Sequence, residues 1–256
     1  MSLSAQDWHR RFTLQSRWTL ATRKYLYDRT GVAKSKKMLD VGCGTGAITQ
    51  ELTQRTGSSI TGLDINQEFI AIAHSENPSA NFLLADAHQM PIESSKFDIC
   101  LCHFLLLWVN APSAVISEMK RVTKPGGEIL ILAEPDYGGR IDFPYDLTIL
   151  NEWQTESLRN QGANPTIGRE IKSILYQSGL MDIEVGVVGA QWTDVPSQEE
   201  IISEWEIILS DLGYLKNTSE VMRTSEIIRK MDEIAWENGD RVLYVPTFYA
   251  RAKVSK

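Results

Sequence analysis

Apolar residues follow two alternating patterns through the first half of this chain. Short apolar runs typical of buried strands are separated by segments whose apolar residues have helical spacing. The predicted strands are residues 38–41, 59–63, 81–85, 97–103 and 128–133, and the predicted helices between them include 47–54, one that starts at Asn66 and one that starts near Pro112. Alternating strands and helices favour a parallel sheet with helices on both faces. We therefore predict an α/β fold with a Rossmann-like, doubly wound sheet.

The two ends of the chain depart from this rhythm. Residues 1–36 have near-helical apolar spacing, and Gly31 is expected to end the helix. Residues 182–188 and 248–254 read as two further strands, which makes a seven-stranded, mostly parallel sheet.

The stretches 136–165 and 191–240 interrupt the core pattern. The second contains Ser197-Gln198-Glu199-Glu200, a capping box that opens a helix, and another helix is expected over 220–238. We predict one domain, 1–256, with the parts 1–36 (N-terminal helical cap), 37–135 (cofactor-binding core), 136–165 and 191–240 (helical insertions that form a lid) and 241–256 (last strand).

Composition is ordinary for a globular domain, with 43% hydrophobic and 23% charged residues. The net charge of -7 argues against general nucleic-acid binding, so we expect no nucleic-acid partner. Basic residues nevertheless crowd the N-terminal segment: Arg10, Arg11, Arg17, Arg23, Lys24, Arg29, Lys34, Lys36 and Lys37. A solvated amphipathic helix is the preferred interpretation, and a patch for an anionic substrate is the alternative.

Other sequence features concern location and metals. No apolar run approaches the roughly 20 residues of a membrane span, and the start lacks the apolar stretch of a signal peptide. Three cysteines favour a reducing compartment, so a cytoplasmic location is expected. Cys100, Cys102 and His103 resemble a metal cluster, but on a strand the two cysteines share one face and His103 takes the other. We therefore expect buried structural cysteines and no metal site.

The strongest chemical signal is Leu39-Asp40-Val41-Gly42-Cys43-Gly44-Thr45-Gly46, which follows a strand and opens a helix. Glycines let the backbone turn sharply and let a ligand lie against bare main chain. Asp64 ends the next strand about 20 residues later, where a carboxylate can bind both ribose hydroxyls of a nucleotide. Taken alone, the loop also fits the fingerprint of a dinucleotide-binding site. A glycine turn that binds no ligand is the alternative to both kinds of nucleotide site.

Downstream motifs separate these interpretations. The glycine loop resembles the first motif of class I S-adenosylmethionine-dependent methyltransferases. Residues 84–92 with 97–99 resemble their D-A-x-x-L-P…F-D-x-V block, and residues 121–127 resemble their R-x-L-K-P-G-G turn. The chain is most similar to the broad methyltransferase type 11 subgroup that contains the ubiquinone and menaquinone C-methyltransferases. The resemblance covers residues 36–135 well and implies S-adenosylmethionine as the cofactor.

Carried over residue by residue, the resemblance implies cofactor contacts from Asp40, Gly42, Cys43, Gly44, Gly46, Asp64, Ile65, Asp86, Ala87, His103 and Phe104. In it, Asp40 holds the amino-acid end of the cofactor and Asp64 binds the ribose, with Ile65 against the adenine. Asp86 accepts a hydrogen bond from the exocyclic amine, although a helix N-cap carboxylate is the alternative interpretation of this residue. His103 and Phe104 face the methyl-transfer region.

The resemblance carries over no catalytic residue, because transfer from a sulfonium mainly requires alignment of the acceptor and exclusion of water. The candidates are His103, Glu134, Asp136 and Tyr137, with Arg140 beside them, because ligands of such sheets bind beyond the carboxyl ends of the strands. A turn stabilised by local hydrogen bonds is an equal alternative for residues 134–140.

We expect a small-molecule acceptor. An RNA or protein methyltransferase that uses the basic N-terminal segment, a nicotinamide-dependent oxidoreductase and a non-catalytic adenosylmethionine-binding module remain alternatives. The sequence indicates neither the acceptor nor the oligomeric state.

Overall fold

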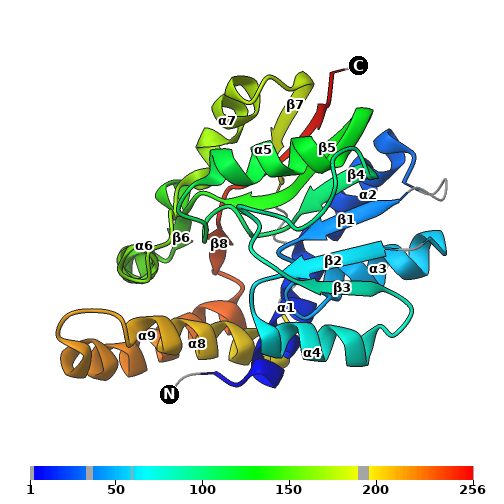
Figure 1. The fold of residues 1–256 in the computed structure, drawn as a ribbon. Helices are drawn as coiled ribbons and strands as arrows, with labels where there is room; N and C mark the ends of the chain where they lie inside the picture. The colour runs from blue at the N-terminus through cyan, green and yellow to red at the C-terminus, as the bar shows by residue number, and fades with distance from the viewer. Residues whose placement is uncertain (1–2, 33–36, 59, 190–195, 256) are drawn as a thin grey trace.

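A seven-stranded sheet forms the centre of the computed structural model, which describes residues 3–32, 37–58, 60–189 and 196–255 (Figure 1). Its strands lie in the order β3 (Asn81–Leu84), β2 (Ile60–Asp64), β1 (Met38–Val41), β4 (Phe97–Cys102), β5 (Thr123–Pro135), β9 (Thr247–Lys253) and β7 (Met181–Val187). The pairs from β3 to β5 are parallel, and β9 runs antiparallel to both of its neighbours. The predicted seven-stranded, mostly parallel sheet is confirmed, although β5 is longer than residues 128–133.

Helices cover both faces of this sheet, as its side-chain alternation requires. On one face α5 (Pro112–Val122) and α7 (Ile171–Gln177) bury their apolar residues against Cys100, Cys102 and their neighbours. On the other face α2 (Leu20–Thr30) and α3 (Ala47–Thr56) pack against Ile99 and Leu101. The two cysteines therefore share one face of β4, as predicted, and the doubly wound arrangement is confirmed.

The sheet order places β1 beside both β2 and β4, so chain connections leave β1 and β4 in opposite directions. A crevice opens at such a switch point, outside the carboxyl ends of the strands, and this is where open α/β sheets bind ligands. The glycine loop follows β1, and His103 follows β4.

The N-terminal segment consists of two helices, α1 (Ala5–Trp18) and α2, where the apolar spacing predicted one continuous helical segment. The break lies at Thr19, whose backbone is not helical and whose side chain caps neither helix. Gly31 ends α2 in the left-handed conformation, as predicted.

The two insertions build a separate helical layer below the sheet in Figure 1. The first contains η1 (Tyr137–Gly139), β6 (Ile141–Phe143), η2 (Tyr145–Thr148) and α6 (Ile149–Asn160), and η3 (Ile167–Glu170) follows it. The second contains α8 (Gln198–Leu212), opened by the predicted capping box at Ser197, and α9 (Thr218–Asn238). Residues 191–195 of this insertion lie outside the described residues.

A small sheet joins the first insertion to the segment that follows the second insertion. β6 pairs antiparallel with β8 (Val242–Tyr244), so residues 241–256 hold two strands where one was predicted. The layer has its own apolar core, which includes Leu150, Trp205, Ile208 and Leu212.

Buried charges tie this layer together. Arg241 donates to Asp142 at 2.7 Å and to Asp232 at 2.6 Å, and all three side chains are at most 8% exposed. Asp142 also accepts from Arg140, and Asp232 accepts from the indole of Trp205 at 2.9 Å. Each buried carboxylate is thus paired and hydrogen-bonded, which offsets its desolvation.

Candidate functional site

The glycine loop between β1 and α3 turns through three left-handed residues, Gly42, Gly44 and Gly46, with φ of 68°, 53° and 87°. The loop begins against the neighbouring strand, because the amides of Gly42 and Cys43 both donate to the carbonyl of Leu63. A Cβ on Gly42 would lie 2.6 Å from Leu105. These positions therefore require glycine both for conformation and for close packing.

Asp64, at the end of β2, clasps this loop. One carboxylate oxygen accepts from the amide of Gly44 at 2.8 Å, and the other accepts from the amide of Asn66 at 2.9 Å. Each oxygen can accept a second hydrogen bond, so both can still bind hydroxyl groups. Burial raises the pKa of Asp64, against the hydrogen bonds that lower it. The next residue, Ile65, is 71% exposed and offers apolar surface beside the carboxylate.

Asp86 and Ala87 lie after β3, on the other side of the same loop. Asp86 is exposed, and one of its oxygens accepts from both the amide and Nδ1 of His88, which lowers the pKa of Asp86. Ala87 is buried in the core below. Asp86 accepts a hydrogen bond from the amide of His88, as a helix N-cap carboxylate would. No helix begins at this position, so the alternative interpretation of Asp86 as a helix N-cap is wrong.

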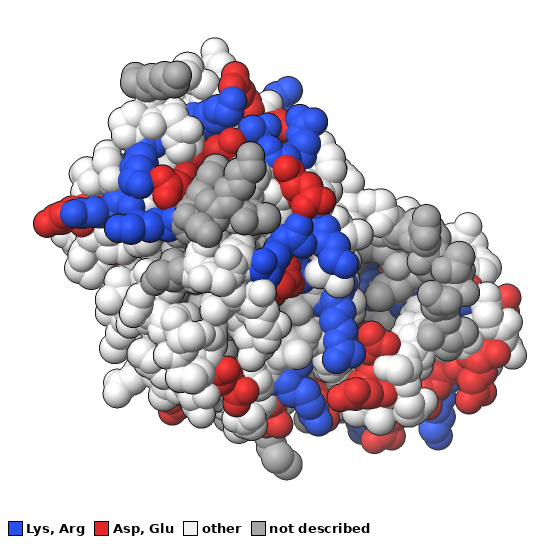
Figure 2. All heavy atoms as spheres, turned by 90° about the vertical axis from the view of Figure 1, so that its right-hand side faces the viewer, with Lys and Arg blue, Asp and Glu red and all other residues white. Residues whose placement is uncertain are grey.

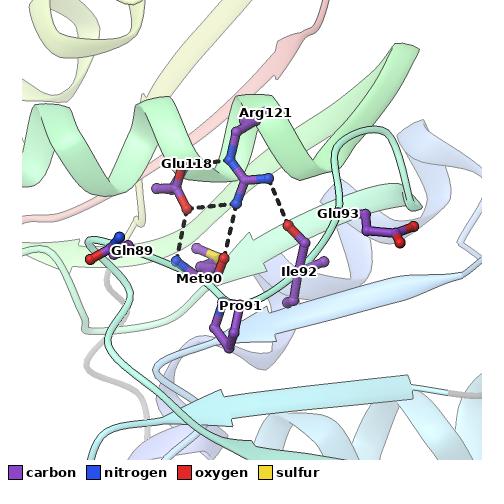
Figure 3. Close-up of a pocket in the computed structure, with 7 residues that line it drawn as sticks. All are labelled: Gln89, Met90, Pro91, Ile92, Glu93, Glu118 and Arg121. Carbon is purple, nitrogen blue, oxygen red and sulfur yellow. Dashed lines mark hydrogen bonds and ion pairs between the residues drawn. The ribbon is translucent and has the colours of Figure 1, made fainter.

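The loop that continues from Asp86 is fixed by a side-chain brace (Figure 3). Arg121 of α5 donates to the carbonyls of Met90 and Ile92 and to the carboxylate of Glu118, and Glu118 accepts from the amide of Met90. These residues line an open pocket, yet its charged groups are bonded to the loop. The R-x-L-K-P-G-G motif therefore supports the Asp86 segment through its arginine.

Asp40 and Cys43 lie beneath the surface of the site. Asp40 is 1% exposed and accepts a hydrogen bond from Thr49 at 2.7 Å, and burial raises its pKa to about 7. Cys43 is 8% exposed, and burial raises the pKa of its thiol. Both residues support the loop from within, and a cofactor contact from Asp40 stays a prediction.

The end of β4 faces the glycine loop. Phe104 adopts a left-handed conformation, with φ of 52°, and its ring lies 4.4 Å from that of His103. His103 is half-buried, and Thr19 hydrogen-bonds its Nε2 at 2.8 Å. Burial and the nearby charge of Arg23 lower the pKa of His103 to about 3. The ring is therefore neutral near pH 7 and is a weak base.

Helix α1 covers the glycine loop; the sequence predicted an N-terminal helical cap but not these contacts. Phe12 lies over Gly44, with a ring carbon 3.1 Å from where a Cβ would be, and it packs edge-on against Phe69 of α4 (Gln67–Glu76). His9 hydrogen-bonds Thr45 at 2.9 Å. The aromatic spacing of α1 was visible in the sequence, but its partner on the loop was not.

The same helix is joined to α8 by ion pairs across the chain. Arg11 donates to Glu204 at 2.7 Å, and Arg10 donates to Glu206 at 2.7 Å. Arg11 is 7% exposed, and its second terminal nitrogen, Nη1, is buried without a partner among the described residues. The charge of Arg11 and its hydrogen bond lower the pKa of Glu204, against burial, which raises it.

Glu134, a candidate catalytic residue, is fully buried. Its carboxylate accepts from the amides of Leu105, Leu106 and Leu107 at 2.9, 2.7 and 3.3 Å. Burial raises its pKa to about 8, against these hydrogen bonds. The side chain fixes the segment after β4 and has no exposed oxygen for an acceptor.

Residues 136–140 are also largely committed to local contacts. Asp136 is 5% exposed and forms a bidentate ion pair with Arg169, at 2.6 and 2.8 Å. Arg140 is bonded to Asp142. Tyr137 is half-buried, and burial together with the charges of Glu204 and Asp211 raises its pKa to about 12. Of this group, Tyr137 is the member whose pKa responds to the carboxylates of α8.

The basic N-terminal segment is largely neutralised within the fold. The ion pairs are Arg10 with Glu206, Arg11 with Glu204, Arg23 with Glu51 and Arg29 with Glu184. On the face shown in Figure 2, groups of Lys and Arg have Asp or Glu beside them. Lys34 and Lys36 lie outside the described residues. Arg11 and Arg23 are buried in these pairs, at 7% and 1% exposure, so they are not the solvated surface charges that the preferred interpretation predicted. None of the described helices has the length and apolar character of a bilayer span.

Comparison with known proteins agrees with this geometry. The family described as "Methyltransferase domain" matches residues 39–131. The demethylmenaquinone methyltransferase of Renibacterium salmoninarum is 30% identical over 177 residues, which cover 68% of this chain and 73% of that protein. The malonyl-[acyl-carrier protein] O-methyltransferase of Hamiltonella defensa is 35% identical over 105 residues, 41% of this chain and 40% of that protein.

A solved structure of phosphoethanolamine N-methyltransferase 2 from Haemonchus contortus, in complex with S-adenosyl-L-methionine, has the same fold. It matches with a TM-score of 0.60 at 20% identity, covering 93% of this chain and 52% of that one. This chain thus spans about half the length of several proteins that it matches. The chain belongs to the class I S-adenosylmethionine-dependent methyltransferases.

The residues present fit the family's cofactor, S-adenosylmethionine. Asp64 keeps free lone pairs for ribose hydroxyls, Ile65 exposes apolar surface for a base, and Asp86 has an exposed carboxylate. The left-handed glycines place side-chain-free main chain at the switch point, and Phe12 lies over it at Gly44.

Proposed function

We propose that this protein transfers a methyl group from S-adenosylmethionine to a small-molecule acceptor. The observation that carries the proposal is the hydrogen bond between the glycine loop and Asp64, at the switch point of the sheet. Membership of the methyltransferase family gives this position its meaning. The cofactor supplies an electrophilic methyl group on its sulfonium.

The chain's own residues bind and align. Asp64, Ile65 and Asp86 hold the nucleoside, and the glycine loop receives the remainder of the cofactor against its main chain. His103 and Tyr137 lie on the acceptor side, His103 after β4 and Tyr137 after β5. Glu134 and Asp136 support the site, because their oxygens are occupied by backbone amides and by Arg169.

The cover over the site supports a small acceptor. Phe12 lies on the glycine loop, and the pair of Arg11 with Glu204 joins α1 to α8 on the same side. Such a cover excludes water from the reacting groups, and it leaves less room for a folded RNA or protein than an open strand edge would. A cytoplasmic location stays part of this proposal.

The experiment is a transfer assay with methyl-labelled S-adenosylmethionine and acceptor extracts separated by size. We expect label to enter molecules of low mass. Label that enters only RNA or protein, or that is lost at moderate salt, would favour the alternative acceptors. Cofactor binding without transfer to any fraction would favour a binding module.

A further inference from the structure

A chain of side chains from three elements ends on His103. Arg23 of α2, which is 1% exposed, donates to both carboxylate oxygens of Glu51 on α3 and, through Nη1, to Oγ1 of Thr19 at 2.5 Å. Oγ1 of Thr19 lies 2.8 Å from Nε2 of His103. Thr19 itself is 3% exposed, so water does not compete for its hydroxyl group.

The lengths of these hydrogen bonds favour one position for the proton of His103. A guanidinium nitrogen can only donate, so Oγ1 of Thr19 accepts from Arg23. The hydroxyl hydrogen is then free to point at Nε2 of His103. The other acceptor in reach, the carbonyl of Ser16, is 3.5 Å away and already accepts from Arg23. The second lone pair of Oγ1 could accept from Nε2–H only if the hydroxyl group donated across 3.5 Å to the carbonyl of Ser16, whereas donation to Nε2 spans 2.8 Å. The shorter contact favours Nε2 as the acceptor and the ring proton on Nδ1.

The position of Thr19 in the chain makes this contact unusual. Thr19 is the N-cap residue of α2, where a threonine side chain ordinarily accepts from a backbone amide of the first turn. Here no such cap bond forms, and the hydroxyl group is directed at His103 instead.

Nδ1 is the ring nitrogen available to a ligand. Among the described residues Nδ1 has no hydrogen-bond partner. It is also not one of the fully buried atoms that lack a partner, so it is accessible. His103 immediately follows β4, and the segment after it packs Leu105 against Gly42 of the glycine loop. His103 thus lies at the carboxyl ends of the strands, where the proposed reaction takes place.

We propose that Glu51, Arg23 and Thr19 hold His103 in the neutral form protonated on Nδ1, so that His103 acts as a hydrogen-bond donor to an oxygen atom of the acceptor rather than as a base. This inference rests on the proposed function for the identity of the site. Thr19 and Arg23 are positioning residues, and His103 is the group that touches the acceptor. The acceptor class is a carboxylate, phenol or enol, whose oxygen lone pairs can accept from Nδ1.

The test is nitrogen NMR of the imidazole rings in the full chain, which has only four histidines. His103→Asn assigns the His103 signals by their disappearance. In the wild type we expect Nδ1 to give a protonated signal and Nε2 an unprotonated one, unchanged between about pH 5.5 and 8. A protonated Nε2, or a ring that titrates within this range, would overturn the proposal without any variant.

Thr19→Val keeps the side-chain shape but removes the hydroxyl group. We expect its His103 ring to lose the fixed tautomer, while Thr13→Val, a matched change on α1 whose hydroxyl bonds the carbonyl of His9, leaves the His103 signals unchanged. An identical tautomer in Thr19→Val would show that the relay does not position the ring.

The donor role is tested with acetate and ethylammonium as probes, added at equal ionic strength to the complex with S-adenosylhomocysteine. We expect acetate to shift the Nδ1 signal and ethylammonium to leave it in place. If acetate leaves the Nδ1 signal in place, the donor role is overturned. Calorimetric binding of S-adenosylhomocysteine separates the two proposals. If S-adenosylhomocysteine binds but the ring of His103 has the other tautomer, only the inference about His103 fails. If the ring has the expected tautomer but S-adenosylhomocysteine does not bind, the proposed function fails.

Discussion

Asp64→Ala probes the residue that joins the glycine loop to the proposed ribose site. The substitution removes the carboxylate that accepts from Gly44 and Asn66, and with it the acceptors for two hydroxyl groups. Charge-assisted hydrogen bonds contribute about 1.5–3 kcal/mol each, but the loop amides can bond to water in the variant. We therefore expect a net loss of about 1–3 kcal/mol in binding of S-adenosylhomocysteine, or about 5- to 150-fold in Kd.

Isothermal titration calorimetry measures this change, with far-ultraviolet circular dichroism to verify the fold. The matched control is Asp146→Ala, an exposed aspartate in η2, which should leave Kd unchanged. Because burial raises the pKa of Asp64, wild-type affinity should fall as the pH is lowered through that raised pKa, and Asp64→Asn should lack this dependence. An unchanged Kd in a folded Asp64→Ala protein would remove Asp64 from the site.

Two further predictions concern the helical layer. Arg241→Met leaves Asp232 buried without its cation, so it should lower the free energy of unfolding by about 3–5 kcal/mol in urea denaturation. Arg229→Met, at an exposed pair with Glu233, should lower it by at most about 1 kcal/mol. Equal effects would contradict the stabilising role of the buried network. S-adenosylhomocysteine should slow hydrogen exchange in residues 8–26 and 199–212 more than in the central strands, because α1 contacts the glycine loop and is paired with α8. Equal exchange with and without S-adenosylhomocysteine would mean that these helices are a fixed scaffold and do not form a lid.

The core of the fold could be predicted because its signals are local. Apolar runs that end in Gly42 or Asp64 mark buried strands followed by turns, and each of these strands lies within a residue or two of its predicted position. The capping box at Ser197 was equally reliable, since its hydrogen bonds join residues three positions apart. The glycine loop is recognisable in the sequence for the same reason, because its residues are consecutive.

Contacts between distant segments could not be predicted. The break at Thr19 has no glycine or proline to mark it, and the side chain that Thr19 contacts, His103, is 84 positions away. The pair of Arg11 with Glu204 spans 193 positions, so Arg11 read as one more surface charge. Glu134 looked catalytic from its place after the strand predicted at 128–133, but the amides that donate to it follow β4. Such roles depend on which loops the sheet brings together.

Calorimetric titration of the purified chain with S-adenosylhomocysteine and, separately, with NAD tests the central claim most directly. The glycine loop alone suits either nucleotide, whereas the placement of Asp86 and the brace by Arg121 favour the adenosyl cofactor. We expect S-adenosylhomocysteine to bind and NAD to give no measurable heat. Tighter binding of NAD than of S-adenosylhomocysteine would contradict the account.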